Sequence, residues 1–334
     1  MDIKKRAYGA LLGVALGDAL GMPSELWSRR KVKDYFGEIT EFLPGPPGHL
    51  VADGMQAGEV TDDTMQTIKV AEALIADNGR VRPETIVTKL LELVAENNAL
   101  ETNMLGPSSK RALAAIKEGV PLEESGKMGT TNGAAMRIVP VGIISPIENL
   151  TGLVDNVEQA CLPTHNTNIA IAGAAAVAAA VSTALEGASL EEILNNAVKA
   201  MRIGDERGHD TFGASIIART YWALRIVEES VLPEEAMEKL YNLIGAGVET
   251  TESVPTALAL FKLANGDPYR AGLLAANLGG DCDTIGAIAC GICGAFTGID
   301  GIPTFCQEKI LAVNDFNFKE LSADLLSFRG GKQF

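Results

Sequence analysis

The feature that most constrains the fold of this chain is the spacing of its apolar residues, which repeat with a period near 3.6 in almost every long segment. In residues 64–76, for example, Met65, Ile68, Ala71 and Leu74 fall on one stripe. Runs of β-branched residues are short, and no stretch longer than a few residues alternates apolar and polar side chains. The sequence therefore predicts an all-α protein. The expected helices cover residues 4–20, 64–76, 83–95, 190–202, 214–229, 234–244, 254–263, 268–277 and 284–297.

These helices are expected to form one compact, single-domain bundle. No Pro/Ser-rich linker, low-complexity tract or internal repeat divides the sequence, and helical periodicity resumes directly after the Gly/Pro-rich stretch 43–58. Alanine and glycine recur within several helices, which allows helix backbones to approach closely. We therefore expect a single domain over residues 1–330, with residues 331–334 as a frayed tail.

Charge and cysteine content limit the classes of partner. The formal net charge is −15, and so acidic a surface repels phosphate backbones, which argues against a nucleic-acid duplex as a ligand. Five cysteines, an odd number in a long chain, indicate a reducing compartment and not a disulfide framework. Cys290 and Cys293 fall on an apolar helical face and are expected in the core. We expect a cytoplasmic protein, and the sequence leaves its oligomeric state open.

Two apolar segments resemble targeting or membrane signals. The basic and apolar start of the chain looks like a signal peptide, but Asp18 interrupts the apolar run and no small-residue cleavage site closes it. Residues 166–185 form the longest uncharged stretch, yet they are mostly alanine and glycine, and alanine contributes little to membrane insertion. A buried helix is the better interpretation of residues 166–185, and we expect no membrane partner for the protein.

Two short acidic motifs carry the chemistry. GEVTDDT (58–64) and GGDCDTIG (279–286) each place two aspartates and a threonine where a helix begins. Helix capping explains either motif in isolation, because acidic and hydroxyl side chains stabilise helix N-termini. Together the motifs offer six oxygen donors, the ligand type that Mg²⁺, Mn²⁺ or Ca²⁺ requires. The four carboxylates would repel one another strongly if brought close, and two divalent cations would remove that repulsion.

Over nearly its whole length the sequence resembles the ADP-ribosylglycohydrolases. The resemblance rests on five segments in order: GALLGVALGDALGMPSE (9–25), GEVTDDT (58–64), TNGAAMRIVPVGI (131–143), LPTHNTN (162–168) and NLGGDCDTIGAIACGICGAFTGIDGIP (277–303). It implies an all-helical fold that holds two Mg²⁺ or Mn²⁺ ions, and Glu25 matches the acidic residue beside the metals in that family. The metal ligands that it implies are Thr61, Asp62, Asp63, Asp281, Asp283 and Thr284.

The resemblance also implies a reaction, hydrolysis of the glycosidic bond that joins ADP-ribose to a protein side chain or a small molecule. In that reaction Glu25, Asp62 or Asp63 could accept a proton from the attacking water, and Glu25 is favoured as a gating carboxylate beside the metals. Two alternatives remain. One is a metal-dependent ribonucleoside or other small N-riboside hydrolase, and the other is a non-enzymatic binding or structural protein. The complete ligand set argues against the non-enzymatic alternative.

Candidates for substrate binding come from three further places. Asn132 and Gly133 lie in a turn before a helix, where backbone amides could hold phosphate, although a plain turn fits these residues as well. His165 could line the ribose pocket, or it could cap or pack a helix. The loop 45–58 could close over substrate or merely connect helices.

One departure from the family bears on substrate choice. Members that act on ADP-ribosyl-arginine are expected to carry an aspartate in the loop that here reads LETNMLGPSSKRAL, where Asn103 is nearest and Glu101 is the only acid. An asparagine cannot form a charge-assisted bidentate pair with a guanidinium. We therefore expect ADP-ribosyl-arginine to be a poor substrate, unless Glu101 or Asp53 supplies the charge.

Overall fold

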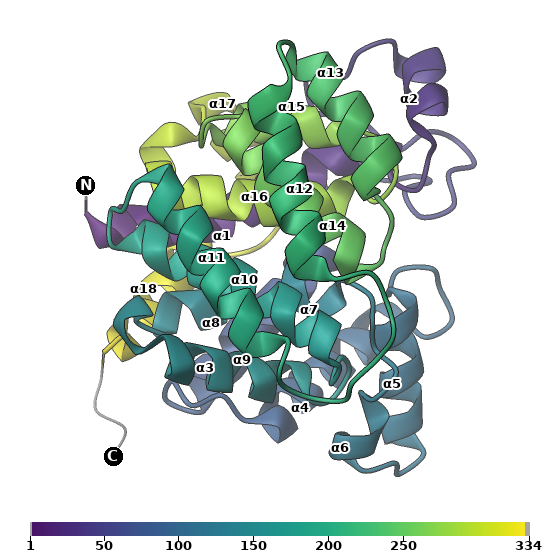
Figure 1. Cartoon of the computed structure of the whole chain (residues 1–334). Coiled ribbons are helices and arrows are strands. Elements are labelled where there is room, and N and C mark those ends of the chain that lie inside the picture. Colours follow the sequence, from purple (N-terminus) through teal and green to yellow (C-terminus); the bar gives the residue numbers. More distant parts are fainter. Residues whose placement is uncertain (1, 331–334) are drawn as a thin grey trace.

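The structure, a computed structural model, describes residues 2–330, and every regular element in that range is a helix (Figure 1). The all-α prediction is confirmed. The tail expected at residues 331–334 lies outside the described residues. The α-helices are α1 (Ile3–Gly21), α2 (Arg29–Phe36), α3 (Asp62–Ala76), α4 (Pro83–Asn97), α5 (Pro107–Lys117), α6 (Leu122–Ser125), α7 (Gly133–Met136), α8 (Val139–Ile144), α9 (Leu150–Cys161), α10 (Asn168–Leu185), α11 (Leu190–Gly204), α12 (Ile216–Glu229), α13 (Pro233–Lys239), α14 (Thr250–Leu263), α15 (Pro268–Ala276), α16 (Cys282–Thr297), α17 (Thr304–Val313) and α18 (Phe318–Phe328). Four shorter helical turns are η1 (Met22–Ser24), η2 (Ile147–Asn149), η3 (Leu240–Ile244) and η4 (Ile299–Gly301).

The helices expected from periodicity are all present. Most of their ends lie within about two residues of the expected ones, the usual uncertainty of a helix boundary. Helix α14 begins earlier than expected, at Thr250, whose N–H and hydroxyl both donate to the carbonyl oxygen of Thr130. The helices that were not expected are α2, α5, α6, α7, α8, α9, α17 and α18. Of these, α6, α7 and α8 have only four to six residues, too few to display a helical period.

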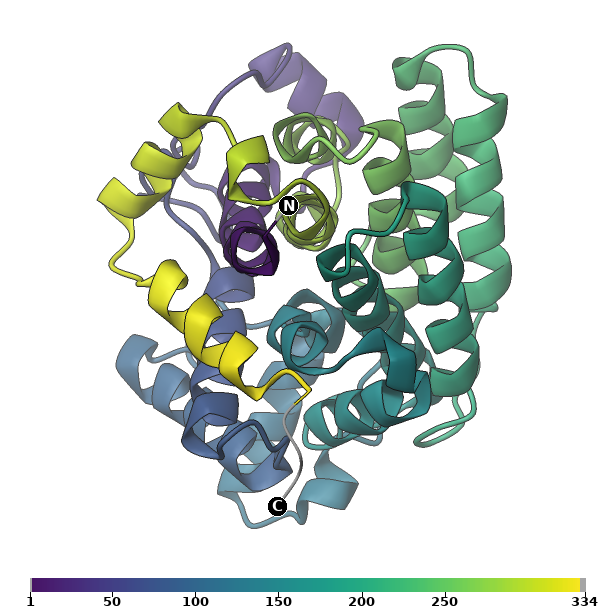
Figure 2. The same ribbon diagram turned by 90° about the vertical axis from the view of Figure 1, so that its left-hand side faces the viewer.

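Helix α1 runs through the centre of the molecule and packs along α16 (Figure 2). Glycine occupies every fourth position of α1 from Gly9 to Gly21, so these residues form a stripe on one face. A Cβ at Gly13 would lie 2.2 Å from the carbonyl oxygen of Cys290. The two backbones are therefore in contact, an approach that only glycine allows. As a result, the C-terminal end of α1 lies beside the N-terminal end of α16.

Helix α10 is the one helix of the described chain that is long and apolar enough to cross a membrane, yet 94% of that segment is buried inside the protein. It packs against α8, α9 and α11. The prediction of a buried helix is confirmed, and its alanines allow these neighbours to approach closely.

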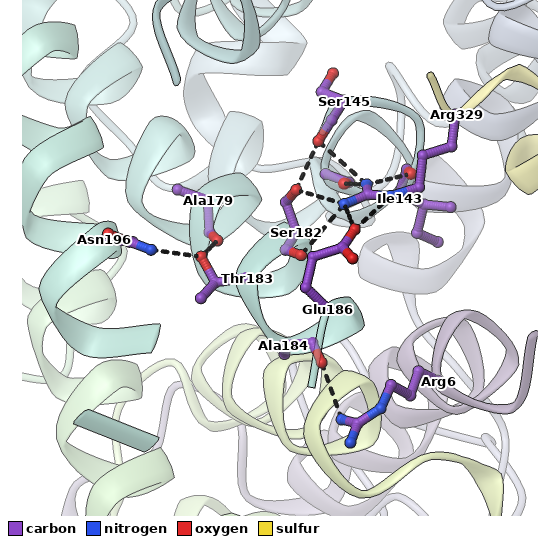
Figure 3. Close-up of polar contacts among 11 residues, drawn as sticks. Arg6, Ile143, Ser145, Ala179, Ser182, Thr183, Ala184, Glu186, Asn196 and Arg329 are labelled. Atoms are coloured by element: carbon purple, nitrogen blue, oxygen red, sulfur yellow. Dashed lines mark hydrogen bonds and ion pairs between the residues drawn. The ribbon is translucent and has the colours of Figure 1, made fainter. Parts of the chain in front are cut away.

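Two arginines near the ends of the chain bind the C-terminal end of α10 (Figure 3). Arg6 donates to the carbonyl oxygen of Ala184 at 2.9 Å. Arg329 donates to the carbonyl oxygen of Ile143 in α8 at 2.8 Å and forms an ion pair with Glu186 at 2.7 Å. Because the last carbonyl groups of a helix have no partner within the helix, these guanidinium groups satisfy them and hold neighbouring helix ends together.

One cluster of buried apolar side chains extends from α1 to α18, and a smaller cluster lies beneath α2. All five cysteines are buried free thiols. Cys290 and Cys293 of α16 are fully buried, as their position on an apolar helical face predicts.

Candidate active site

Two helix N-termini coincide with the two acidic motifs. Helix α3 has Thr61 as its N-cap, and the backbone N–H of Asp63 donates to the Thr61 hydroxyl at 3.4 Å. Helix α16 follows Asp281, whose side chain makes no capping hydrogen bond. The capping interpretation therefore fits Thr61 and fails for Asp281. The dipoles of both helices favour negative charge at these positions.

The fold brings these acids together with two others from α1 and the turn that follows it. Asp18, Asp63 and Asp283 form one group, and Glu25, Asp281 and Asp283 form another. Within each group the ligand oxygens lie within 4.8 Å of one another, and every residue is buried. Asp283 belongs to both groups, so the two are adjacent.

Asp18 was not singled out as a site residue from the sequence. It is fully buried, and its carboxylate accepts the backbone N–H groups of Thr61 at 3.0 Å and Thr64 at 3.1 Å. The hydroxyl of Thr64 donates to the same carboxylate at 2.5 Å. Asp18 therefore holds the first turn of α3 against α1. The signal in the sequence is a lone carboxylate inside an apolar helix, because a buried charge requires partners.

Burial raises the pKa of every carboxyl in this cluster. The pKa of Asp18 rises to about 6 and that of Asp62 to about 7, in both cases mainly because the charged form is desolvated. Burial, followed by repulsion from neighbouring carboxylates, raises the pKa values of Glu25, Asp63 and Asp283 well above their ordinary range. So many buried carboxyl groups destabilise the ionised form of the site unless bound cations offset their mutual repulsion.

The oxygens of the cluster fit divalent cations. Glu25 Oε2, Asp63 Oδ1 and Asp283 Oδ1 are buried and have no hydrogen-bond partner in the described chain. The hydroxyls of Thr61 and Thr284 lie 3.2 and 3.3 Å from Asp63 Oδ2. Carboxylate and hydroxyl oxygens are the ligands that Mg²⁺, Mn²⁺ and Ca²⁺ prefer. A bound cation would also offset the cost of leaving three carboxylate oxygens buried and unpaired.

The segment after Glu25 is fastened to the loop that carries Asp281. The N–H of Leu26 donates to the carbonyl oxygen of Gly280 at 2.7 Å, and the N–H of Gly280 donates to that of Trp27 at 2.7 Å. Leu26 has a φ of 55°, a left-handed conformation that a leucine rarely adopts. This strained turn fixes Glu25 beside the second acidic group.

His49, which was also missed from the sequence, joins the loop 45–58 to the same segment. Its Nδ1 accepts the N–H of Ala52 at 3.0 Å, so Nε2 carries the proton and donates to the carbonyl oxygen of Glu25 at 2.9 Å. Burial lowers the pKa of His49, which keeps its ring neutral. The next residue, Leu50, lines the pocket described below, so this loop contributes to the pocket wall.

A pocket of about 310 Å³ opens onto the acids. All the candidate residues from the sequence line it except Thr61 and His165. Asn132 and Gly133 therefore lie in the pocket wall beside the acids. The carboxamide of Asn132 donates a hydrogen bond to Asp281, which ties this part of the wall to the second acidic motif.

His165 is fully buried behind this wall. Its Nδ1 lies 2.7 Å from the hydroxyl of Thr164, and its Nε2 lies 3.3 Å from that of Thr131. Burial lowers the pKa of His165 well below its usual value, so the ring is neutral. The packing interpretation of His165 matches this geometry, whereas direct contact with a ribose in the pocket does not.

Another part of the pocket wall comes from residues 102–110, which lead into α5. Asn103 lies there, and its Nδ2 donates to the carbonyl oxygen of Leu50 at 3.4 Å. The N-terminus of α5 has no side-chain cap, and Lys110 on its first turn lines the pocket. The ammonium of Lys110 donates to the carbonyl oxygen of Thr102 at 2.9 Å, so this wall carries one cation beside a helix N-terminus, in contrast to the acidic wall. Lys110 was not singled out from the sequence, because an isolated lysine carries no pattern.

A family model described as ADP-ribosylglycohydrolase matches residues 1–329. The chain belongs to the ADP-ribosylglycohydrolase family. The resemblance seen in the sequence is thus confirmed, and so is the expectation of an enzyme: members of this family are glycosidases, and the protein is one of them.

Two relatives and one solved structure show how similar this chain is to known proteins. The uncharacterized protein YegU of Escherichia coli is 43% identical over 325 residues, which cover 97% of each chain. The ADP-ribosylarginine hydrolase Tri1 of Pseudomonas putida is 27% identical, with 91% of this chain and 74% of Tri1 covered. A solved structure of an ADP-ribosylglycohydrolase-related protein complex superposes with a TM-score of 0.71 at 26% identity, covering 98% of this chain and 99% of that one.

Proposed function

We propose that the protein uses two divalent cations, Mg²⁺ or Mn²⁺, to cleave the glycosidic bond between ADP-ribose and a protein side chain or small molecule. The observation that carries this proposal is the pair of acidic groups that share Asp283. Two adjacent groups joined by one aspartate suit two neighbouring cations. The residues that would hold the cations are Asp63, Asp281 and Asp283 of these groups, together with Thr61, Asp62 and Thr284, which the family resemblance implies.

When bound, the cations would orient the ribose hydroxyls and the attacking water, and they would lower the pKa of that water. The protein supplies the rest. Glu25 lines the pocket with one unpaired oxygen, so it could accept a proton from the attacking water. Asp62 lines the same wall, and Gln66 Nε2 holds its Oδ2 at 2.6 Å, which leaves the other oxygen for a ligand. Asp18 fixes the first turn of α3, on which Asp62 and Asp63 lie.

The wall that carries Lys110 supports ADP-ribose over a simple riboside. A diphosphate entering this pocket would be repelled by the acidic groups unless positive charge opposed them. Lys110 and the uncapped N-terminus of α5 supply such charge, in a chain whose formal net charge is −15. A nucleoside without phosphates would gain nothing from this wall.

The same wall argues against arginine as the acceptor. In the described chain the pocket lining includes Asn103 and Lys110 but neither Glu101 nor Asp53. A guanidinium placed there would meet an amide and a cation instead of a carboxylate. ADP-ribosyl-arginine is therefore expected to be a poor substrate here, although the relative Tri1 is an ADP-ribosylarginine hydrolase.

The experiment is a comparison of kcat/KM, in Mg²⁺ and in Mn²⁺, for ADP-ribosyl-serine, ADP-ribosyl-arginine and simple ribonucleosides. We expect an ADP-ribosylated compound to be preferred. Lys110→Met should raise KM for that compound and leave KM for the nucleosides unchanged, and Lys117→Met at the far end of α5 is the matched control. A preference for nucleosides, unaffected by Lys110→Met, would establish the riboside hydrolase instead.

A further inference from the structure

Arg137 directly follows α7 and is only 1% exposed. Its Nη1 donates to Gln66 Oε1 and its Nη2 donates to the hydroxyl of Thr164, each at 2.6 Å. Burial lowers the pKa of Arg137 to about 10, so the group is still charged near neutral pH. Both partners are neutral side chains. Because burying a cation against neutral partners is costly, its position calls for a role.

Each nitrogen, Nη1 and Nη2, starts a chain of hydrogen bonds, called here an arm, and the arm from Nη1 leads to Asp62, a candidate metal ligand. Gln66 lies one turn after Asp62 in α3, and its Nε2 donates to Asp62 Oδ2 at 2.6 Å. A guanidinium can only donate hydrogen bonds, so Gln66 must turn its oxygen to Arg137 and its amide hydrogens to Asp62. With a neutral apolar side chain at position 137, Gln66 Oε1 would be left buried without a donor, so the carboxamide would no longer be held in this place. Arg137 therefore fixes the orientation of Gln66, and through it that of Asp62.

The other arm leads toward the second acidic motif. The hydroxyl of Thr164 accepts from the guanidinium, and its only other hydrogen-bond partner in the described chain is His165 Nδ1, 2.7 Å away, so its own proton points to Nδ1. His165 must then carry its proton on Nε2, which lies 3.3 Å from the hydroxyl of Thr131. Thr131 precedes Asn132, whose carboxamide donates to Asp281. This second chain of hydrogen bonds also has its direction set by the arginine.

The two arms brace opposite parts of one site. The first ends on α3, and the second ends on the segment that contacts the loop before α16. A charge at the start of a hydrogen-bond chain polarises every following link, so a fixed cation strengthens both arms. Arg137 is absent from the pocket lining in the described chain, so it acts through its neighbours and not on the substrate.

We propose that Arg137 is a positioning residue for the metal centre, because it sets the direction of two hydrogen-bond chains, one that ends on Asp62 and one that ends on Thr131, the residue before Asn132. This inference rests on the metal centre of the proposed function. It predicts that removing the guanidinium weakens metal binding without removing any metal ligand.

The test is the affinity of the metal-free, full-length protein for Mn²⁺, measured by titration calorimetry. Arg137→Met and Gln66→Met should each weaken Mn²⁺ binding, by about 10- to 100-fold, the usual effect of losing a residue that orients a metal ligand. Arg137→Lys should restore only part of the loss, since an ammonium lacks the planar fork that reaches two partners. The double variant should lose no more affinity than Arg137→Met alone, because both changes interrupt the same chain.

The matched control is Arg329→Met, which removes a buried guanidinium that binds carbonyl oxygens such as that of Ile143, away from the pocket. It should lower the melting temperature and leave Mn²⁺ affinity unchanged. A second measurement does not require metal. Nitrogen-15 NMR of the imidazole should show His165 protonated at Nε2 alone in the wild type, and a mixture of tautomers in Arg137→Met.

Wild-type Mn²⁺ affinity in a folded Arg137→Met variant would contradict the inference, as would additive losses in the double variant. If Arg137→Met does not fold, Gln66→Met and Arg137→Lys decide the question, and wild-type affinity in both would overturn the proposal. If the wild-type protein itself binds no Mn²⁺, the proposed function fails instead, and this inference fails with it.

Discussion

Gly17 of α1 and Gly286 of α16 are in direct backbone contact: a Cβ at Gly17 would lie 2.0 Å from the carbonyl oxygen of Gly286 and 2.1 Å from its carbonyl carbon. Asp18 follows Gly17 in the sequence, and Asp283 lies about one turn before Gly286. The close approach of the two helices therefore sets how near these two acids come. Stability and site geometry depend on the same contact.

Gly17→Ala should destabilise the protein by about 1–3 kcal/mol, because the added methyl group meets rigid backbone and not the end of a flexible side chain. Thermal unfolding measures the effect. Gly213→Ala is the control, since a Cβ there meets only Ile169 Cδ1, at 2.9 Å, and the loop is exposed. Equal melting temperatures for the wild type and Gly17→Ala would show that α1 and α16 can separate without cost.

Asp283→Ala should abolish hydrolysis and leave the fold intact. Asp283 belongs to both acidic groups, so its loss weakens both cation sites at once. In the absence of metal the variant should be at least as stable as the wild type, because one buried and repelled carboxyl is gone. The measurements are turnover and the rise in melting temperature on addition of Mn²⁺. A variant that keeps wild-type turnover and the full Mn²⁺-induced rise would show that Asp283 is only a helix-terminal residue.

The stabilisation that Mn²⁺ provides should grow as pH rises from about 5 to about 7. The pKa values of Asp18 and Asp62 are raised to about 6 and about 7 in the metal-free fold. An acid whose pKa is raised by folding costs nothing below its unfolded value, near 4, and destabilises the fold as pH rises through its folded value. Bound cations offset this loss of stability, because they favour the ionised form of the carboxyl groups. A Mn²⁺-induced rise in melting temperature that is the same at pH 5 and pH 7 would contradict the buried acidic cluster.

Asn103→Asp should improve kcat/KM for ADP-ribosyl-arginine by roughly one to two decades, because a charge-assisted pair with a guanidinium contributes on the order of 1.5–3 kcal/mol. Asn103 lines the pocket, where an added carboxylate could meet the acceptor. Thr102→Asp, on the same wall, tests whether position matters. If wild-type protein already prefers ADP-ribosyl-arginine by a clear margin over ADP-ribosyl-serine, the inference from Asn103 is wrong.

The sequence revealed those parts of the fold that repeat or cluster locally. Helices such as α3 and α16 span several turns, so their periods are visible, and their acidic motifs stand at their starts. Helix α7 has only four residues, too few for a period, and it was expected only as a turn before a helix. The place of α7 in the site depends on contacts with segments that are distant in the sequence.

The same distinction explains which site residues were missed. Asp18, His49 and Arg137 each act through partners that lie distant in sequence: Arg137 Nη1 and Gln66 Oε1, for example, are 71 positions apart. Isolated residues of this kind carry no spacing pattern, so only the folded chain shows that they converge. His165 shows the opposite case, since its sequence context is distinctive and yet it lies behind the pocket wall.

The central claim is that hydrolysis depends on divalent cations held by the acidic cluster, and metal removal tests it most directly. The protein would be treated with EDTA and dialysed, and release of ADP-ribose from its preferred substrate would be followed before and after addition of Mg²⁺ or Mn²⁺. We predict that activity falls to background in the metal-free protein and returns on addition of either ion. Full activity in protein shown to be metal-free would contradict the proposed mechanism.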